Sequence, residues 1–167
     1  RQTAIEHMIL SASGWRGIFG EDEYSLAASI TPPMRDITAV AADTFISTLV
    51  ASGPKRPNST ARIVLATDSR PTGPAIADTV LRLCLHRDIE VRWLGITSTP
   101  EVIAFATHES GIDGFFYITA SHNPPGHNGF KMGFADGGVM AGEHAWPLIA
   151  RFRARVKDQI YVDELVN

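Results

Sequence analysis

Residues 63–70 read Ile-Val-Leu-Ala-Thr-Asp-Ser-Arg, and this stretch sets the fold class of the chain. Its first five residues form a short, largely apolar run that is bounded by Arg62 and Asp68. Such a run between charged residues is typical of a buried strand. We therefore expect a strand over residues 63–67, with the polar side chains of Asp68 and Arg70 just beyond its carboxyl end.

Helices and strands alternate downstream of this strand. Turn formers followed by apolar residues at helical spacing predict a helix over residues 72–87, and a second helix over 99–109 in which Thr99 serves as the N-cap. Apolar runs at 90–96 and 114–119 predict two further strands. This order of elements is typical of a parallel sheet with helices on both faces.

A fourth strand is predicted at residues 129–134. It follows the third after only about ten residues, which is short for a helical crossover, so we expect it to be antiparallel. The predicted fold is therefore α/β: a three-layer α/β/α sandwich with a mixed, mainly parallel sheet of about four strands, the last one antiparallel. Ligands of such sheets gather at the carboxyl ends of the parallel strands.

Three segments complete the predicted elements. Residues 34–50 have apolar positions at helical spacing, and Thr31 is placed to cap this helix, with two prolines in its first turn. Residues 52–60 are rich in turn formers and predict a loop. A last helix is expected over residues 143–157.

Composition narrows the class of protein. The chain has 167 residues, of which 44% are hydrophobic and 20% charged, enough for one globular domain with a core. The formal net charge of −3 gives no reason to expect a partner nucleic acid or membrane surface. No apolar run approaches the roughly 18 residues of a transmembrane helix. The lone cysteine, Cys84, is expected to be a buried, inert thiol.

The first residue is Arg1, with no initiator methionine and no signal-like apolar segment. We therefore expect a processed, trimmed or excised chain, with the cytoplasm as its default compartment.

Residues 119–131 carry the chemistry that the sequence offers. They read Thr-Ala-Ser-His-Asn-Pro-Pro-Gly-His-Asn-Gly-Phe-Lys and follow the third strand directly. The Ser121 hydroxyl at a strand's carboxyl end and the Lys131 ammonium form a plausible pair for phosphoryl transfer, an oxygen nucleophile and a cation that offsets charge. The alternative is a structural turn whose serine and asparagine side chains satisfy backbone groups.

Other chemistries fit these residues less well. A serine hydrolase using Ser121 and His122 is disfavoured because adjacent residues seldom hold the geometry of nucleophile and base, and no Gly-x-Ser-x-Gly elbow occurs. A metal site of His122, His127 and Asp136 matches no zinc spacing. Neither the P-loop motif nor the dinucleotide-binding glycine motif is present.

Four motifs together resemble the first domain of the α-D-phosphohexomutases, which include phosphoglucomutase and phosphomannomutase. Residues 119–124 and 128–131 resemble the active-site loop of that family. The Ser-Gly-Trp-Arg-Gly segment at 13–17, the Asp-Ser-Arg at 68–70 and Thr99 with the following proline are similar to further family motifs, in the same order.

This resemblance implies a mutase chemistry. Family enzymes interconvert hexose 1-phosphates and 6-phosphates through a phosphoserine and a bisphosphorylated sugar, and Ser121 stands at the position of that serine. Lys131 and Arg16 stand where the family places cations near the reacting group, and His122 borders the site. The resemblance assigns substrate binding or loop support to five further residues: Ser13, Asn123, Asn128, Asp68 and Arg70.

The resemblance also implies that this chain covers one domain of a longer enzyme. We expect residues 1–142 to be the serine domain, and residues 143–167 to be a closing helix and the lead into a second domain that is absent here. Family members bind Mg²⁺ through the phosphoserine, here on Ser121, and an aspartate-rich loop of the second domain; residues 135–138 contain a single acid.

We expect the partners of the chain to be a phosphosugar and the missing domains, without which it should hold no tight Mg²⁺ and turn over poorly. The alternative function is a non-catalytic phosphosugar-binding or regulatory module on the same fold.

Overall fold

A computed structural model describes residues 1–56, 59–136 and 138–166. Its centre is a six-stranded sheet with the strand order β1-β2-β6-β5-β3-β4. The strands are β1 (Ile9–Ser11), β2 (Gly14–Ile18), β3 (Arg62–Thr67), β4 (Glu90–Ile96), β5 (Gly114–Ile118) and β6 (His127–Phe134).

The centre of the sheet matches the sequence prediction. Strand β3 pairs in parallel with both β4 and β5, and β6 returns antiparallel to β5. The strand count is higher than the predicted four, because β1 and β2 extend the sheet antiparallel to β6. Residues 9–18 are missed because strands of three and five residues, joined by a tight turn at Gly14 with φ of 137°, show little alternation.

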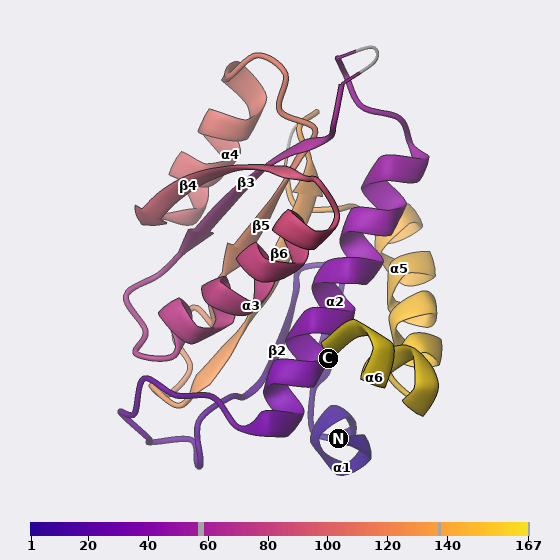
Figure 1. Ribbon diagram of the computed structural model, residues 1–167. Coiled ribbons are helices and arrows are strands. Elements are labelled where there is room, and N and C mark those ends of the chain that lie inside the picture. The colour runs from indigo at the N-terminus through magenta and orange to yellow at the C-terminus, as the bar shows by residue number, and fades with distance from the viewer. Residues whose placement is uncertain (57–58, 137, 167) are drawn as a thin grey trace.

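Helices cover both faces of the sheet, which confirms the three-layer α/β/α arrangement (Figure 1). Helix α4 packs on β3 and β5 from one side. The other side carries α2, α3 and α5, with α1 and α6 at its margin. The helices are α1 (Gln2–Glu6), α2 (Pro32–Ala51), α3 (Gly73–His86), α4 (Thr99–His108), α5 (Gly142–Arg155) and α6 (Gln159–Val166).

Alternation along β5 divides the core between the two faces. Phe116 belongs to the larger hydrophobic cluster, under α2, whereas Phe115 and Tyr117 belong to the smaller one, under α4. This division follows from the two-residue period of a strand. In the larger cluster the Phe116 ring lies 5.0 Å from that of Phe130, so β5 and β6 are joined through side chains as well as hydrogen bonds.

Helix starts follow local chemistry. Thr31 is the N-cap of α2 and prolines occupy its first turn, as predicted. The N-cap of α4 is Ser98, not the predicted Thr99. The reason is a capping box, in which the Glu101 carboxylate accepts the Ser98 N–H at 3.3 Å. That motif needs a spacing of three residues, which Ser98 has and Thr99 lacks.

The C-terminal helices belong to the same core as the sheet. Helix α5 replaces the predicted helix at 143–157 nearly residue for residue, and its Phe152 ring lies 4.6 Å from that of Trp15 on β2. Helix α6 was not anticipated. The Arg1 guanidinium donates a hydrogen bond to Gln159 Oε1 on α6 at 2.6 Å. The two ends of the described chain therefore lie close together, as Figure 1 shows. The predicted division at residue 142 stays a prediction, and Asn167 lies outside the described residues.

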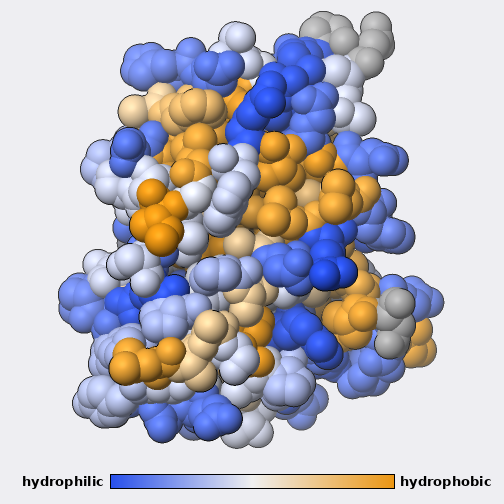
Figure 2. All heavy atoms as spheres, turned by 60° about the vertical axis from the view of Figure 1, so that its left-hand side comes forward, coloured by the Kyte–Doolittle hydropathy of each residue, from blue (hydrophilic) through white to orange (hydrophobic). Residues whose placement is uncertain are grey.

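Smaller predictions have clear outcomes. Cys84 is buried, and burial raises the pKa of its thiol to about 12, so it is inert as expected. Of the predicted loop at 52–60, residues 57–58 lie outside the described part. No helix in that part is both long and apolar enough to cross a membrane. Figure 2 shows the face that carries β4, where apolar patches alternate with charged side chains.

Candidate active site

Ser121 lies at the carboxyl end of β5, in a loop of residues 119–126 that we call the serine loop. Its side chain is exposed, and its backbone has a φ of 59°, in the left-handed region. A residue with a Cβ pays about 1–2 kcal/mol for this conformation, so neighbouring groups must hold it there. The sequence expectation that Ser121 stands at the open end of the sheet is consistent with this placement.

Thr119 holds the amino side of Ser121. The Ser121 N–H donates to Thr119 Oγ1 at 3.1 Å, and the Thr119 hydroxyl donates to Asp68 Oδ2 at 2.7 Å. Asp68 follows β3, the neighbour of β5 in the sheet, so the parallel pairing brings the two segments together. The sequence analysis includes Thr119 in the motif but assigns it no role. The feature that could have identified it is a hydroxyl two residues before the serine.

Arg70 holds the carboxyl side of the same loop. Its guanidinium donates to the carbonyl oxygens of Ser121 at 2.9 Å and Asn123 at 2.6 Å. It also reaches the carbonyls of Pro124 and His127. Its Nε lies 3.3 Å from Asp68 Oδ2. The predicted Asp68–Arg70 pair therefore exists and supports the serine loop.

The far side of the serine loop is fixed against residues 19–23. Gly126 N–H donates to Glu23 O at 2.9 Å, and Gly126 O accepts the N–H groups of Phe19 and Gly20. A Cβ at Gly126 would lie 1.9 Å from Asp22 O, so glycine is required for this close approach. Two separate parts of the chain thus meet at the loop, and sequence reasoning missed this contact.

Arg16 and Lys131 lie on one face of the sheet. Arg16 pairs with Gly129, two residues before Lys131 on β6, so the two cations point to the same side. Lys131 pairs with Tyr117 across β5, which places this face on the α4 side of the sheet. Helix α4 packs on β3 and β5, so the cations on β2 and β6 stand beside it rather than beneath it.

Neither cation is neutralised by the described part of the chain. Within residues 1–56, 59–136 and 138–166, Arg16 and Lys131 take part in no salt bridge. The Thr119 N–H donates to the Gly129 carbonyl, and Gly129 is the partner of Arg16 in the sheet, so this half-buried cationic face adjoins the start of the serine loop. Two such cations attract an anion.

The remaining predicted residues divide by position. Asn128 is fully buried, where its amide donates to Thr72 Oγ1 at 2.9 Å and its Oδ1 accepts the Gly129 N–H. It therefore joins the start of β6 to the residue before α3, and its predicted role in substrate binding or loop support stays a prediction. Ser13 lies in the β1–β2 turn, with its Oγ 3.0 Å from that of Ser11.

Two histidines, His122 and His127, lie in or next to the serine loop. His122 Nδ1 lies 3.5 Å from Ser121 Oγ, the outer limit of a hydrogen bond. His127 links the serine loop to the segment of residues 19–23. Its Nδ1 lies 3.4 Å from Asn123 Nδ2, and its Nε2 lies 3.7 Å from a carboxylate oxygen of Glu23. Asn123 thus contacts His127 at the end of the serine loop, and its role as a loop organiser stays a prediction.

Tyr117 is a further polar group on the cationic face. Its hydroxyl donates to Thr97 O at 2.7 Å. Burial, together with the nearby charge of Asp68, raises the pKa of Tyr117, so the phenol stays protonated near neutral pH.

The residues present do not form a magnesium site on their own. No group of three or more His, Cys, Asp or Glu within the described part could hold a metal. Of the acids near Ser121, Asp68 has Oδ2 occupied by Thr119 and Arg70, and Oδ1 by the Arg70 N–H. Hard cations such as Mg²⁺ need several free oxygen ligands.

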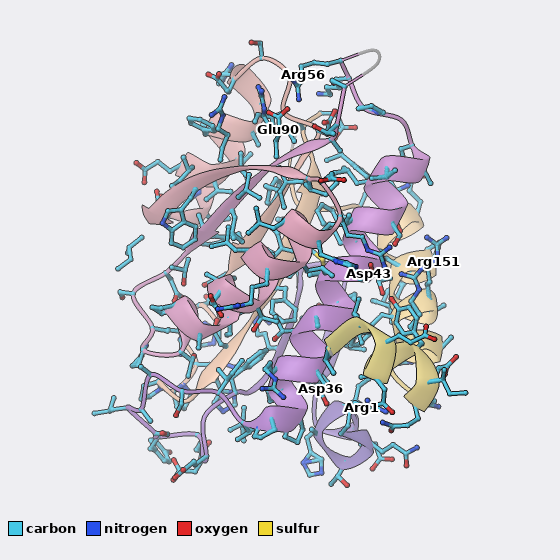
Figure 3. The ribbon with its side chains drawn as sticks, viewed as in Figure 1. Arg1, Asp36, Asp43, Arg56, Glu90 and Arg151 are labelled. Atoms are coloured by element: carbon cyan, nitrogen blue, oxygen red, sulfur yellow. The ribbon has the colours of Figure 1, made fainter. Side chains whose placement is uncertain are left out.

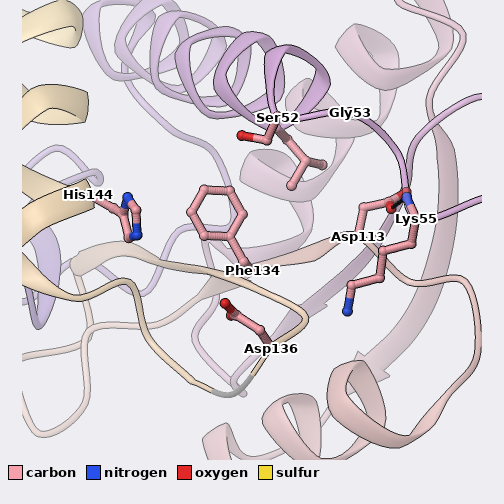
Figure 4. Close-up of a pocket in the computed structure, with 8 residues that line it drawn as sticks. Ser52, Gly53, Lys55, Asp113, Phe134, Asp136 and His144 are labelled. Atoms are coloured by element: carbon pink, nitrogen blue, oxygen red, sulfur yellow. Dashed lines mark hydrogen bonds between the residues drawn. The ribbon is translucent and has the colours of Figure 1, made fainter.

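A cavity of about 290 Å³ lies at the other end of the sheet (Figure 4). Its lining includes Asp113, which precedes β5, whereas Ser121 follows that strand. Asp113 accepts the backbone N–H groups of Lys55 and Arg62, and Lys55 Nζ donates to Ala135 O at 3.2 Å. These groups satisfy one another, so the cavity is not the candidate site.

Comparison with known proteins assigns nearly the whole chain to one protein family, the one that the sequence motifs resemble. The family described as phosphoglucomutase/phosphomannomutase, alpha/beta/alpha domain I, matches residues 7–158. A Neisseria gonorrhoeae phosphoglucomutase is 40% identical over 90 residues, which are 54% of this chain and 19% of that protein. A Thermococcus kodakarensis phosphoglucomutase/phosphomannomutase is 34% identical over 119 residues, 71% of this chain and 23% of that protein.

The fold agrees with a solved structure as well. A phosphoglucomutase/phosphomannomutase family protein from Burkholderia thailandensis superposes with a TM-score of 0.62 at 25% identity, covering 87% of this chain and 31% of that one. The chain spans about a fifth of the length of the curated relatives it matches.

Proposed function

Because the chain belongs to the phosphoglucomutase/phosphomannomutase family through its alpha/beta/alpha domain I, we propose that it is the serine domain of a hexose phosphate mutase and carries phosphate on Ser121. The substrates are hexose 1-phosphates and 6-phosphates, exchanged through a bisphosphorylated sugar. The observation that carries the proposal is the exposed Ser121, held at positive φ at the end of β5, while Arg16 and Lys131 lie on the adjoining face of the sheet and form no salt bridge with the described residues.

The transfer step uses the Ser121 hydroxyl as nucleophile. Oγ attacks the phosphorus of a sugar bisphosphate, an Oγ–P bond forms, and the bond from phosphorus to the sugar oxygen breaks. The serine proton leaves and the sugar oxygen gains one, so phosphate and proton exchange places. His122 Nδ1, 3.5 Å from Oγ, borders the path of that proton.

Electrostatics support the same residues. A phosphoserine carries a charge of about −1.5 to −2 near pH 7 and needs cations and donors around it. Arg16 and Lys131 supply fixed positive charge on the face of the sheet that adjoins the serine loop. Phosphoryl transfer demands mainly positioning and charge stabilisation from the protein, which this arrangement offers.

The rest of the machinery belongs to other parts of the enzyme in this proposal. A phosphate on Ser121 would contribute one oxygen to Mg²⁺, whose role is to neutralise charge on the transferring group. The other ligands would come from outside the residues described here, together with the groups that read the sugar. The 167-residue chain alone is therefore a poor mutase.

Mass spectrometry tests the proposal. The 167-residue chain, and the same chain fused to the remaining domains of a family phosphoglucomutase, are incubated with glucose 1,6-bisphosphate and Mg²⁺. We expect the fusion to gain one phosphate, located on Ser121 by peptide mapping and lost in Ser121→Ala. Absence of phosphate on Ser121 in both proteins, with the sugar still bound, would instead identify a non-catalytic binding module.

A second measurement separates transfer from hydrolysis. A serine hydrolase would react with a fluorophosphonate probe, whereas we expect no labelling, because the contact between Ser121 and His122 is too long for an activated pair. Labelling that disappears in Ser121→Ala would contradict the mutase proposal.

A further inference from the structure

Arg70 is the most highly connected side chain near Ser121. Its guanidinium donates to four carbonyl oxygens, three in the serine loop and one at the start of β6. The side chain is only 10% exposed, so these bonds replace its contacts with water. Carbonyls that would otherwise diverge along a turn are gathered on one cation.

The Asp68 carboxylate restrains the backbone of Ser121 on both sides, through Thr119 on one side and through Arg70 on the other. Asp68 accepts the Thr119 hydroxyl, and Thr119 in turn accepts the Ser121 N–H. Asp68 also pairs with Arg70, which binds the Ser121 carbonyl. Holding both the N–H and the C=O of one residue restricts its φ and ψ, and this accounts for the left-handed backbone at Ser121.

The charge of Arg70 matters as well as its shape. A phosphate on Ser121 would be repelled by the negative ends of nearby carbonyl dipoles. Four carbonyls of residues 121–127 have those ends fixed on a guanidinium instead. The loop is thereby prepared for a dianion before the dianion arrives, which is the meaning of electrostatic preorganisation.

We propose that Arg70 is a positioning residue for phosphoryl transfer: bound to Asp68, it fixes the left-handed backbone of Ser121 and withdraws the loop carbonyls from the phosphate. It acts through the backbone and does not touch the substrate. This inference rests on the proposed function of Ser121.

Lysine cannot replace arginine in this role. A guanidinium presents five N–H donors in a planar fork, whereas an ammonium presents three from one point. Arg70→Lys keeps the charge beside Asp68 but cannot hold four carbonyls at once. The substitution therefore separates the geometric role of Arg70 from its charge.

Arg62→Lys is the matched control. Arg62 begins β3 and Arg70 follows its end, and the Arg62 side chain is similarly buried at 15% exposed. It pairs with Glu90, at the end of the sheet away from Ser121. The two variants lose a largely buried guanidinium at opposite ends of β3, but only Arg70→Lys loses it beside the serine loop.

The test has two readouts. Hydrogen exchange is followed in the 167-residue chain, where Arg70→Lys should speed amide exchange in residues 119–127 by about tenfold and Arg62→Lys should not. The rate at which Ser121 gains phosphate from glucose 1,6-bisphosphate is measured in the fusion. Arg70→Lys should lower the maximal rate by about a hundredfold and leave the half-saturating sugar concentration within about twofold.

The outcomes are distinct. A wild-type fusion that takes no phosphate on Ser121 refutes the proposed function, while exchange still tests the restraint on the loop. A phosphorylated wild type with an unchanged rate in Arg70→Lys overturns the role of Arg70, as does unchanged exchange. If Arg70→Lys does not fold, Asp68→Asn decides, because it removes the negative charge that lies 3.3 Å from the Arg70 Nε and keeps the size of the side chain; an unchanged rate in that variant also overturns the proposal.

Discussion

Two clusters of aspartate and arginine stabilise this domain in opposite ways. In the first, the Asp43 carboxylate on α2 is 1% exposed and lies 2.6 Å from Arg87 and 3.0 Å from Arg155, and it accepts the Tyr161 hydroxyl. Figure 3 places Asp43 where the helices of that face meet. In the second, the Arg70 guanidinium gathers carbonyls of a single loop.

The difference lies in what each charge joins. Asp43 is an acceptor that collects donors from the end of α3, from α5 and from α6, so it ties separate elements to α2. Arg70 is a donor that collects acceptors close together in sequence, so it shapes one loop. We therefore expect Asp43 to govern global stability and the Asp68–Arg70 pair to govern the local conformation at Ser121.

The largest expected effect is that of Asp43→Ala. Losing the shared acceptor leaves Tyr161, Arg87 and Arg155 without their partner, and we expect the free energy of unfolding to fall by about 3 kcal/mol. Urea denaturation followed by circular dichroism measures this. The control is Asp78→Ala, which removes an exposed ion pair with Arg82 and should change stability by at most about 0.5 kcal/mol. Equal losses in the two variants would refute a special role for Asp43.

Gly126→Ala sharpens the comparison from the loop side. Its Cβ would collide with Asp22 O, so the loop or residues 19–23 must shift, and we expect a loss of about 2 kcal/mol. Gly142→Ala is the control, since a Cβ added there would meet only the Trp146 side chain, with Nε1 3.3 Å away, and no backbone atom. A Gly126→Ala protein as stable as the control would show that the serine loop is not tightly docked.

Alkaline pH isolates the contribution of Tyr161. Burial and the hydrogen bond to Asp43 raise the pKa of this phenol above its ordinary value near 10. The folded chain therefore keeps a proton that the unfolded chain releases, so the stabilisation is present at neutral pH and declines as pH rises above about 10. Tyr161→Phe should cost about 1 kcal/mol at pH 7 and remove this part of the decline. Unfolding curves from pH 8 to pH 11 on both proteins would reveal identical slopes if the expectation is wrong.

The smallest expected effect is that of Ser121→Gly. Glycine adopts positive φ without steric strain but loses more conformational entropy on folding, so stability should rise by about 0.5 kcal/mol. Ser121→Ala keeps the Cβ and should be close to neutral. Thermal unfolding compares the three proteins, and a destabilised glycine variant would mean that the backbone at Ser121 is not strained.

Local patterns predicted the parallel centre of the sheet and the return of β6. The apolar runs at 63–67 and 114–119 became β3 and β5, and the ten-residue spacing before β6 required an antiparallel return. The same patterns placed Asp68, Arg70 and Ser121 at one end of the sheet, because the carboxyl ends of parallel strands lie on the same side. Short strands such as β1 and β2 carry too few residues for a period to show.

The residues that complete the site could not be found in this way. Thr119 and Gly126 matter through partners about fifty and a hundred positions away in the chain, Asp68 and Asp22. Asp43 lies among apolar neighbours on α2, and only the approach of Arg87 and Arg155 explains its burial. Hydrogen bonds of this kind have no periodic signature.

Residue order alone thus specifies the α/β class, the end of the sheet where the candidate site lies and the serine placed there. These properties depend on periods and spacings of a few residues, which a linear chain records directly. The left-handed backbone of Ser121, the gathering of loop carbonyls on Arg70 and the alignment of Arg16 with Lys131 arise only when distant segments pack together. Their energies come from contacts between groups that are far apart in the chain, and so they exist only in the folded molecule.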